Sequence, residues 1–93
     1  MNPSTIGILL VEDNAHDAEL TRARLERTGI AVEFQLVDTE AGFVEALHSR
    51  SFDLVLSDFH LPTFSGPEAL RITRAFDSDL PFIFVSGVLG EEH

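Results

Sequence analysis

Four stretches of the chain have the apolar content of β-strands. Residues 6–11 and 82–85 are continuous apolar runs, which is the pattern of strands covered on both faces in a parallel sheet. Residues 54–58 begin apolar and end in a carboxylate, Asp58. Residues 32–37 alternate apolar and polar at their start, which predicts a strand exposed on one side and therefore an edge strand.

Helix signals lie between these strands. Asn14 is a good N-cap for a helix that begins at Ala15, Asp38 or Thr39 can cap a second helix, and residues 65–68 read as a capping box with an early proline. Strands and helices that alternate at this spacing predict right-handed crossovers and a parallel sheet. The phenylalanines are assigned to the core, and the apolar positions assigned to the helices are Ala15, Ala18, Thr21, Leu25, Phe43, Val44, Leu47, Leu70, Thr73 and Phe76.

The composition fits one small domain, residues 1–93. The chain has no cysteine, which excludes disulfides and thiolate metal sites. Residues 1–5 lack the basic start of a signal peptide, and the longest nearly apolar run, residues 80–90, is too short to span a membrane. We therefore expect a cytoplasmic protein with no membrane partner.

The charge is strongly acidic, with a formal net charge of −10, six arginines and no lysine. Such a surface repels phosphate backbones, so we expect no direct nucleic-acid binding by this chain.

Polar residues follow three of the predicted strands at their carboxyl ends: Glu12 and Asp13, Asp58, and Ser86. If the first and third strands are neighbours, their ends lie about 5 Å apart, and the carboxylates repel each other by several kcal/mol at an effective dielectric constant of about 20. In a chain without lysine, an oxygen-preferring cation such as Mg²⁺ is the natural partner, and a backbone carbonyl just past Asp58 could complete its ligands. The simpler readings stay open: the acid pair as helix caps, and Asp58 and Ser86 as turn residues.

Three motifs together resemble the receiver (response-regulator) domain of two-component signalling. They are Leu10-Val11-Glu12-Asp13-Asn14, the segment from Ser57-Asp58 through Leu61-Pro62 to Gly66, and Phe84-Val85-Ser86-Gly87. The resemblance implies an α/β fold, the flavodoxin-like (CheY-like) doubly wound parallel sheet. The family's strand order is 2-1-3-4-5, and this chain would hold the first four strands in the order 2-1-3-4, with the fifth strand and the last helix missing.

The resemblance also assigns roles to individual residues. Asp58 would accept a phosphoryl group from a histidine kinase or phosphotransfer protein, and Glu12, Asp13 and Asp58 would hold Mg²⁺. His60 would lend its backbone carbonyl to the metal, and the Ser86 hydroxyl would turn toward the phosphoryl oxygens and start the conformational switch. A carboxylate is a competent nucleophile toward phosphorus, so such a domain promotes only its own phosphorylation and dephosphorylation and is otherwise not an enzyme.

Some parts of the family pattern have no counterpart in this sequence. The family's lysine and switch aromatic on the fifth strand, and its last helix, are not matched by any residue here. We therefore expect a receiver domain truncated at its C-terminal side, which binds Mg²⁺ weakly and is poorly phosphorylated. Because residues 82–85 would form an uncharged, aromatic edge, we also expect instability or self-association through that strand.

The sequence leaves three other functions to consider. A receiver-like interaction module that is never phosphorylated would have no reason to keep acids that repel each other. A Mg²⁺-dependent phosphohydrolase on a related fold would need a second aspartate two residues after Asp58, where this chain has His60. A flavin site would need a phosphate-binding loop after the first strand, where residues 12–14 would repel phosphate instead.

Overall fold

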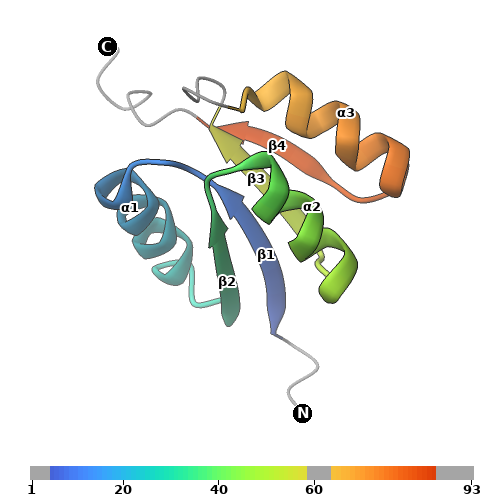
Figure 1. Cartoon of the computed structure of the whole chain (residues 1–93). Coiled ribbons are helices and arrows are strands. Elements are labelled where there is room, and N and C mark those ends of the chain that lie inside the picture. The colour runs from blue at the N-terminus through green and yellow to red at the C-terminus, as the bar shows by residue number, and fades with distance from the viewer. Residues whose placement is uncertain (1–4, 59–63, 86–93) are drawn as a thin grey trace.

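The computed structural model of the chain describes residues 5–58 and 64–85 (Figure 1). Strands and helices alternate along the chain, as the sequence pattern predicts. The elements are β1 (Ile6–Val11), α1 (Ala15–Glu26), β2 (Val32–Val37), α2 (Glu40–Ser49), β3 (Leu54–Asp58), α3 (Gly66–Phe76) and β4 (Phe82–Val85). In the part of the chain that the structure describes, no helix has the length and apolar character needed to cross a membrane.

The four strands form one parallel sheet in the order β2-β1-β3-β4. This order confirms the fold expected from the sequence, and β2 is an edge strand as its alternating pattern indicates. β1 lies in the middle, where Leu10 is opposite Leu36 of β2 and Leu56 of β3. The central position of β1 and β3 explains their nearly uninterrupted apolar sequences.

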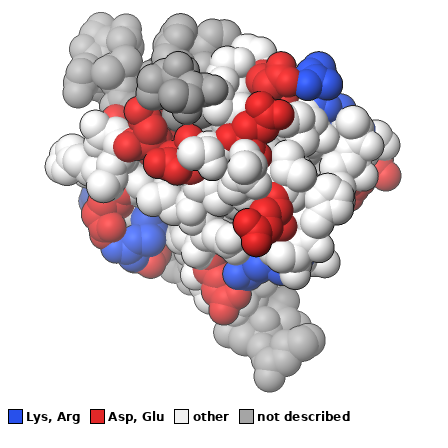
Figure 2. Space-filling view, viewed as in Figure 1, with Lys and Arg blue, Asp and Glu red and all other residues white. Residues whose placement is uncertain are grey.

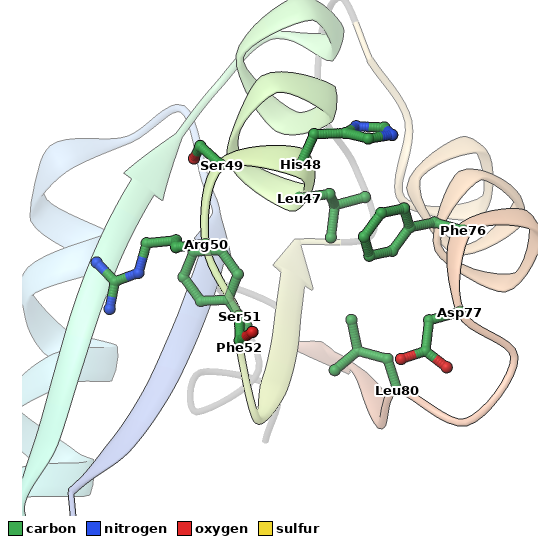
Figure 3. A pocket seen from close by; sticks show the side chains of 9 residues that line it. All are labelled: Leu47, His48, Ser49, Arg50, Ser51, Phe52, Phe76, Asp77 and Leu80. Carbon is green, nitrogen blue, oxygen red and sulfur yellow. The ribbon is translucent and has the colours of Figure 1, made fainter.

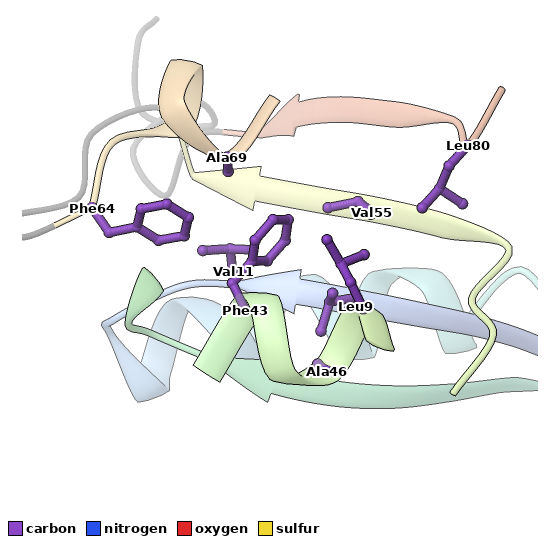
Figure 4. Packing of buried hydrophobic residues seen from close by; sticks show 9 residues of the cluster. Leu9, Val11, Phe43, Ala46, Val55, Phe64, Ala69 and Leu80 are labelled. Carbon is purple, nitrogen blue, oxygen red and sulfur yellow. The ribbon is translucent and has the colours of Figure 1, made fainter. Parts of the chain in front are cut away.

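Alternate residues of the strands enter two separate cores, because successive side chains point to opposite faces of a sheet. On one face Leu9, Val11 and Val55 pack with α2 and α3, around the fully buried Phe43 (Figure 4). On the other face the core formed by Ile8, Leu10, Ala18 and Leu56 lies under α1. The sheet is thus covered by two helices on one side and by one on the other (Figure 1).

Each helix begins at a side-chain cap. Asn14 Oδ1 accepts a hydrogen bond from the Asp17 N–H at 2.9 Å, which confirms the predicted start of α1. The Thr39 hydroxyl accepts from the Gly42 N–H, and the Ser65 hydroxyl accepts from the Glu68 N–H. These bonds satisfy N–H groups that have no partner within the first turn.

The expectation that every phenylalanine is in the core is wrong. Phe43 and Phe64 are buried, but Phe76 is 43% exposed and Phe84 is 38% exposed. Thr73 is the buried inner residue of α3, as predicted, and its hydroxyl donates to the Ala69 carbonyl, so it needs no partner from the sheet. Phe76 is the last residue of α3 and packs edge-on against His48 of α2 at the surface.

Strand β4 pairs with β3 on one side, and no other described strand pairs with it. Ile83 and Phe84 are 51% and 38% exposed. An apolar strand edge of this kind favours association with another strand. Pairing of this strand with a second copy of the chain stays a prediction.

Replacing Gly29 by alanine should lower the free energy of unfolding by about 1 kcal/mol. Gly29 has a φ of 86° in the turn after α1, and an added Cβ would meet no atom within 4 Å. The cost is therefore conformational, and Gly29→Asn should cost less because asparagine tolerates this region better. Urea unfolding of the three proteins checks this, and an alanine variant as stable as the parent would contradict the assigned backbone conformation.

Candidate functional site

The parallel pairing of β1 with β3 brings acidic side chains to one rim of the sheet. Val11 is opposite Ser57 in the register of the two strands, so the next residues, Glu12 and Asp58, are neighbours at the carboxyl ends. The Glu12 N–H extends the β1–β2 ladder by donating to the Val37 carbonyl at 3.0 Å. The Ser57 hydroxyl donates to the Asp58 carbonyl at 3.0 Å and holds the end of β3. Open α/β sheets bind their ligands at this rim.

Glu12, Asp13 and Asp58 each place a carboxylate oxygen within 4.8 Å of the others. Glu12 is 2% exposed and Asp58 is 9% exposed, whereas Asp13 lies at the surface. Three acids therefore converge with two of them shielded from water. Figure 2 shows further acidic side chains on one face of the molecule.

Burial raises the pKa of the Glu12 carboxyl from its ordinary 4.5 to about 7. The Asn14 N–H, which donates to Glu12 Oε2 at 3.1 Å, acts in the opposite direction and favours the ionised form. The charges of Asp58, Asp17 and Asp13 also raise this pKa, and the value of about 7 includes all of these effects. The Glu12 carboxyl therefore keeps its proton to a higher pH than an ordinary carboxyl does, and a nearby positive charge would favour its ionised form.

A divalent cation that prefers oxygen ligands fits this donor set. The cluster offers carboxylate oxygens and no nitrogen or sulfur, the ligand type that Mg²⁺ takes in proteins together with water and phosphate oxygens. Helix capping does not account for the acids, because Asn14 is the N-cap of α1. The convergence that the sequence predicted for Glu12, Asp13 and Asp58 is therefore present.

The structure does not describe the positions of two of the predicted site residues. His60 and Ser86 lie outside the described residues, so their predicted roles stay predictions.

A shallow hollow of about 340 Å³ adjoins the acids on the β2 side and was not predicted from the sequence. Glu12, Asp13 and Asp38 contribute carboxylates to its lining, and Leu36, which is 49% exposed, contributes an apolar wall. One residue could have indicated this hollow from the sequence. Asp38 comes directly after β2, and the carboxyl end of β2 lies at the same rim as Glu12 and Asp13.

Comparison with known proteins gives a consistent result. The family model of the response regulator receiver domain matches residues 8–93. The receiver domain of a sensor histidine kinase from Pseudomonas aeruginosa, whose crystal structure has a magnesium ion coordinated in the active site cleft, is similar with a TM-score of 0.73 and 30% identity, over 86% of this chain and 66% of that chain.

Two curated relatives belong to larger proteins. The transcription factor SKN7 of Saccharomyces cerevisiae is 35% identical over 80 residues, which are 86% of this chain and 12% of that protein. A probable histidine kinase of Oryza sativa is 31% identical over 71 residues, 76% of this chain and 7% of that protein. The chain thus spans a small fraction of the length of these relatives.

Proposed function

This chain belongs to the response regulator receiver domain family of two-component signalling, and on that premise we propose that Asp58 is its phosphoacceptor. The phosphoryl group would come from a phosphohistidine on a histidine kinase or phosphotransfer protein, with Mg²⁺ held by Glu12, Asp13 and Asp58. The observation that carries the proposal is the convergence of these three carboxylates within 4.8 Å at the carboxyl ends of β1 and β3. We further propose that the chain acts in the cytoplasm.

In the proposed reaction an Asp58 carboxylate oxygen attacks phosphorus. A new oxygen–phosphorus bond forms, the bond from phosphorus to the donor's imidazole nitrogen breaks, and that nitrogen keeps the electron pair and takes up a proton. When bound, Mg²⁺ supplies positive charge that offsets the carboxylates and the phosphoryl oxygens. Glu12 and Asp13 would hold the metal together with Asp58, and the Ser57 hydroxyl donates to the backbone carbonyl of Asp58.

Two roles rest on the family motifs alone. The backbone carbonyl of His60 would add an oxygen ligand to the metal, and the Ser86 hydroxyl would donate a hydrogen bond to the phosphoryl group. A phosphoryl oxygen that orders Ser86 would reorganise the segment that follows β4, which is how a local charge change becomes a signal.

The burial of the acids favours phosphate acceptance over a docking role alone. A carboxylate at 2% exposure beside two others costs free energy, and a surface that only docks a partner gains nothing from it. The two functions differ in their response to a phosphodonor, which a docking module would ignore.

Incubation with acetyl phosphate, followed by intact mass spectrometry, tests the proposal. The chain should gain the mass of one phosphoryl group in the presence of Mg²⁺ and none in its absence. Uptake should be slow, because the chain contains no lysine to neutralise the phosphoryl oxygens. No uptake at any Mg²⁺ concentration, or uptake that is equal without the metal, would contradict the proposed role.

A further inference from the structure

A second hollow, of about 400 Å³, lies at the opposite end of the sheet from the acids. Its walls come from the segment that leads from α2 into β3 and from the segment that leads from α3 into β4 (Figure 3). We infer that this hollow binds a small organic cation with an apolar body, such as an arylalkylammonium ion. The inference is independent of the phosphoacceptor proposal, since the two sites share no residue.

The apolar residues that line the hollow indicate that the ligand has an apolar body. Leu47, Phe52, Phe76 and Leu80 all contribute side chains to the lining. Phe76 is 43% exposed, so part of its ring is open to contact with a ligand. Its ring is held in place by the edge-on contact with His48, whose centroid lies 4.9 Å away. The volume lies in the range of about 300–1,000 Å³ that is typical of small-molecule sites.

The charge of the ligand follows from the helix ends. α2 ends at Ser49 and α3 ends at Phe76, and the last residues of both helices line the hollow. The C-terminal end of a helix carries a partial negative charge, so two such ends together favour a cation.

A carboxylate adds to this field. The Asp77 side chain points into the space between Phe76 and Leu80 (Figure 3). The Asp79 N–H donates to Asp77 Oδ1 at 2.9 Å and orients the group. An ammonium ion beside this carboxylate would gain a charge-assisted hydrogen bond while its apolar part contacts Phe76.

The two arginines at the hollow, Arg50 in its lining and Arg74 beside it, already have partners. Arg50 points away from it (Figure 3) and forms an ion pair with Glu33 at 3.2 Å, with its guanidinium 4.9 Å from the centre of the Phe52 ring. Arg74 Nη1 donates to the Leu80 carbonyl at 2.7 Å. Arg50 is thus engaged by Glu33, and Asp77 is the one acid among the lining residues.

A titration of the ¹⁵N-labelled chain with benzylammonium, followed by two-dimensional NMR, tests this inference. The amide signals of residues 47–52 and 76–80 should shift together, with and without Mg²⁺. Benzyl alcohol, which has nearly the same shape without the charge, should bind about tenfold more weakly, since one charge-assisted hydrogen bond contributes about that factor. Benzoate should not shift these signals.

Two variants separate the site from a general attraction to an acidic protein. Asp77→Asn keeps an acceptor for the Asp79 N–H and should weaken benzylammonium binding about tenfold. Asp79→Asn removes the same charge from an exposed position outside the lining and should change the affinity less than about twofold. Equal binding of benzyl alcohol, shifts confined to other residues, or equal losses in the two variants would overturn the inference.

Discussion

Replacing Asp58 by asparagine is expected to abolish Mg²⁺-dependent phosphoryl uptake from acetyl phosphate. An amide oxygen is a poor nucleophile toward phosphorus, whereas the size and shape of the side chain are nearly unchanged. Asp58 is 9% exposed and shares the rim with Glu12 and Asp13, so the substitution also removes one negative charge from a crowded site. The variant should therefore remain folded, and the lost uptake can be assigned to the missing carboxylate.

The matched control is Asp38→Asn. Asp38 is an exposed acid in the neighbouring hollow and is not one of the three converging carboxylates. Intact mass spectrometry should show uptake in the parent and in this control but none in Asp58→Asn. A phosphorylated Asp58→Asn protein, or the same loss in both variants, would show that another group accepts the phosphoryl group.

The second large effect concerns the stability of the metal-free chain. Replacing Glu12 by glutamine should raise the free energy of unfolding by roughly 3 kcal/mol above pH 7, given about 1.4 kcal/mol for each pKa unit. The pKa of Glu12 rises from 4.5 to about 7, mainly through burial. Glu12 therefore ionises at a lower pH in the unfolded chain than in the folded chain. Glutamine keeps an acceptor for the Asn14 N–H without the charge.

The sign of the pH dependence follows from the same values. Below pH 4.5 Glu12 is protonated in both the folded and the unfolded chain. The stabilising contribution of the protonated carboxyl is then fully present. As the pH rises from 4.5 toward 7, the unfolded state loses the proton first, so the parent loses stability relative to the variant. Urea unfolding between these pH values measures the difference, with Glu45→Gln as an exposed control that should change stability by less than about 0.5 kcal/mol.

Magnesium should narrow the difference in stability between the two proteins. A ligand that binds only the folded state stabilises it by about 2.7 kcal/mol at one hundred times its dissociation constant, and Glu12→Gln should lose most of this gain. A variant that is no more stable than the parent without metal, or equally stabilised by Mg²⁺, would contradict the assigned environment of Glu12.

The sequence was sufficient for the parts of the fold that depend on local patterns. The apolar runs of β1, β3 and β4 and the alternation of β2 predict the strands with the bounds that the structure has. Asn14 predicts the start of α1 because its side chain satisfies a backbone N–H of the first turn. Periodicity does not predict the strand order, which came from the family resemblance. No local pattern indicates that β3 pairs with β1 and not with β2, the strand before it in the chain.

The remaining features depend on tertiary packing. No local pattern distinguishes the exposed Phe76 from the buried Phe43, because the difference lies in where each helix ends relative to the sheet. The raised pKa of Glu12 depends on how deeply β1 buries its last residue and on charges from three other positions. Both hollows likewise form between segments that are distant in the sequence.

The central claim is that Glu12, Asp13 and Asp58 hold a divalent cation, and paramagnetic NMR with Mn²⁺ in place of Mg²⁺ tests it most directly. Substoichiometric Mn²⁺ should broaden the amide signals of these three residues first. Signals from the other end of the sheet, such as Gly7 and Asp53, should stay sharp, and added Mg²⁺ should restore the broadened signals. Uniform broadening, or broadening that spares Glu12, Asp13 and Asp58, would contradict the claim.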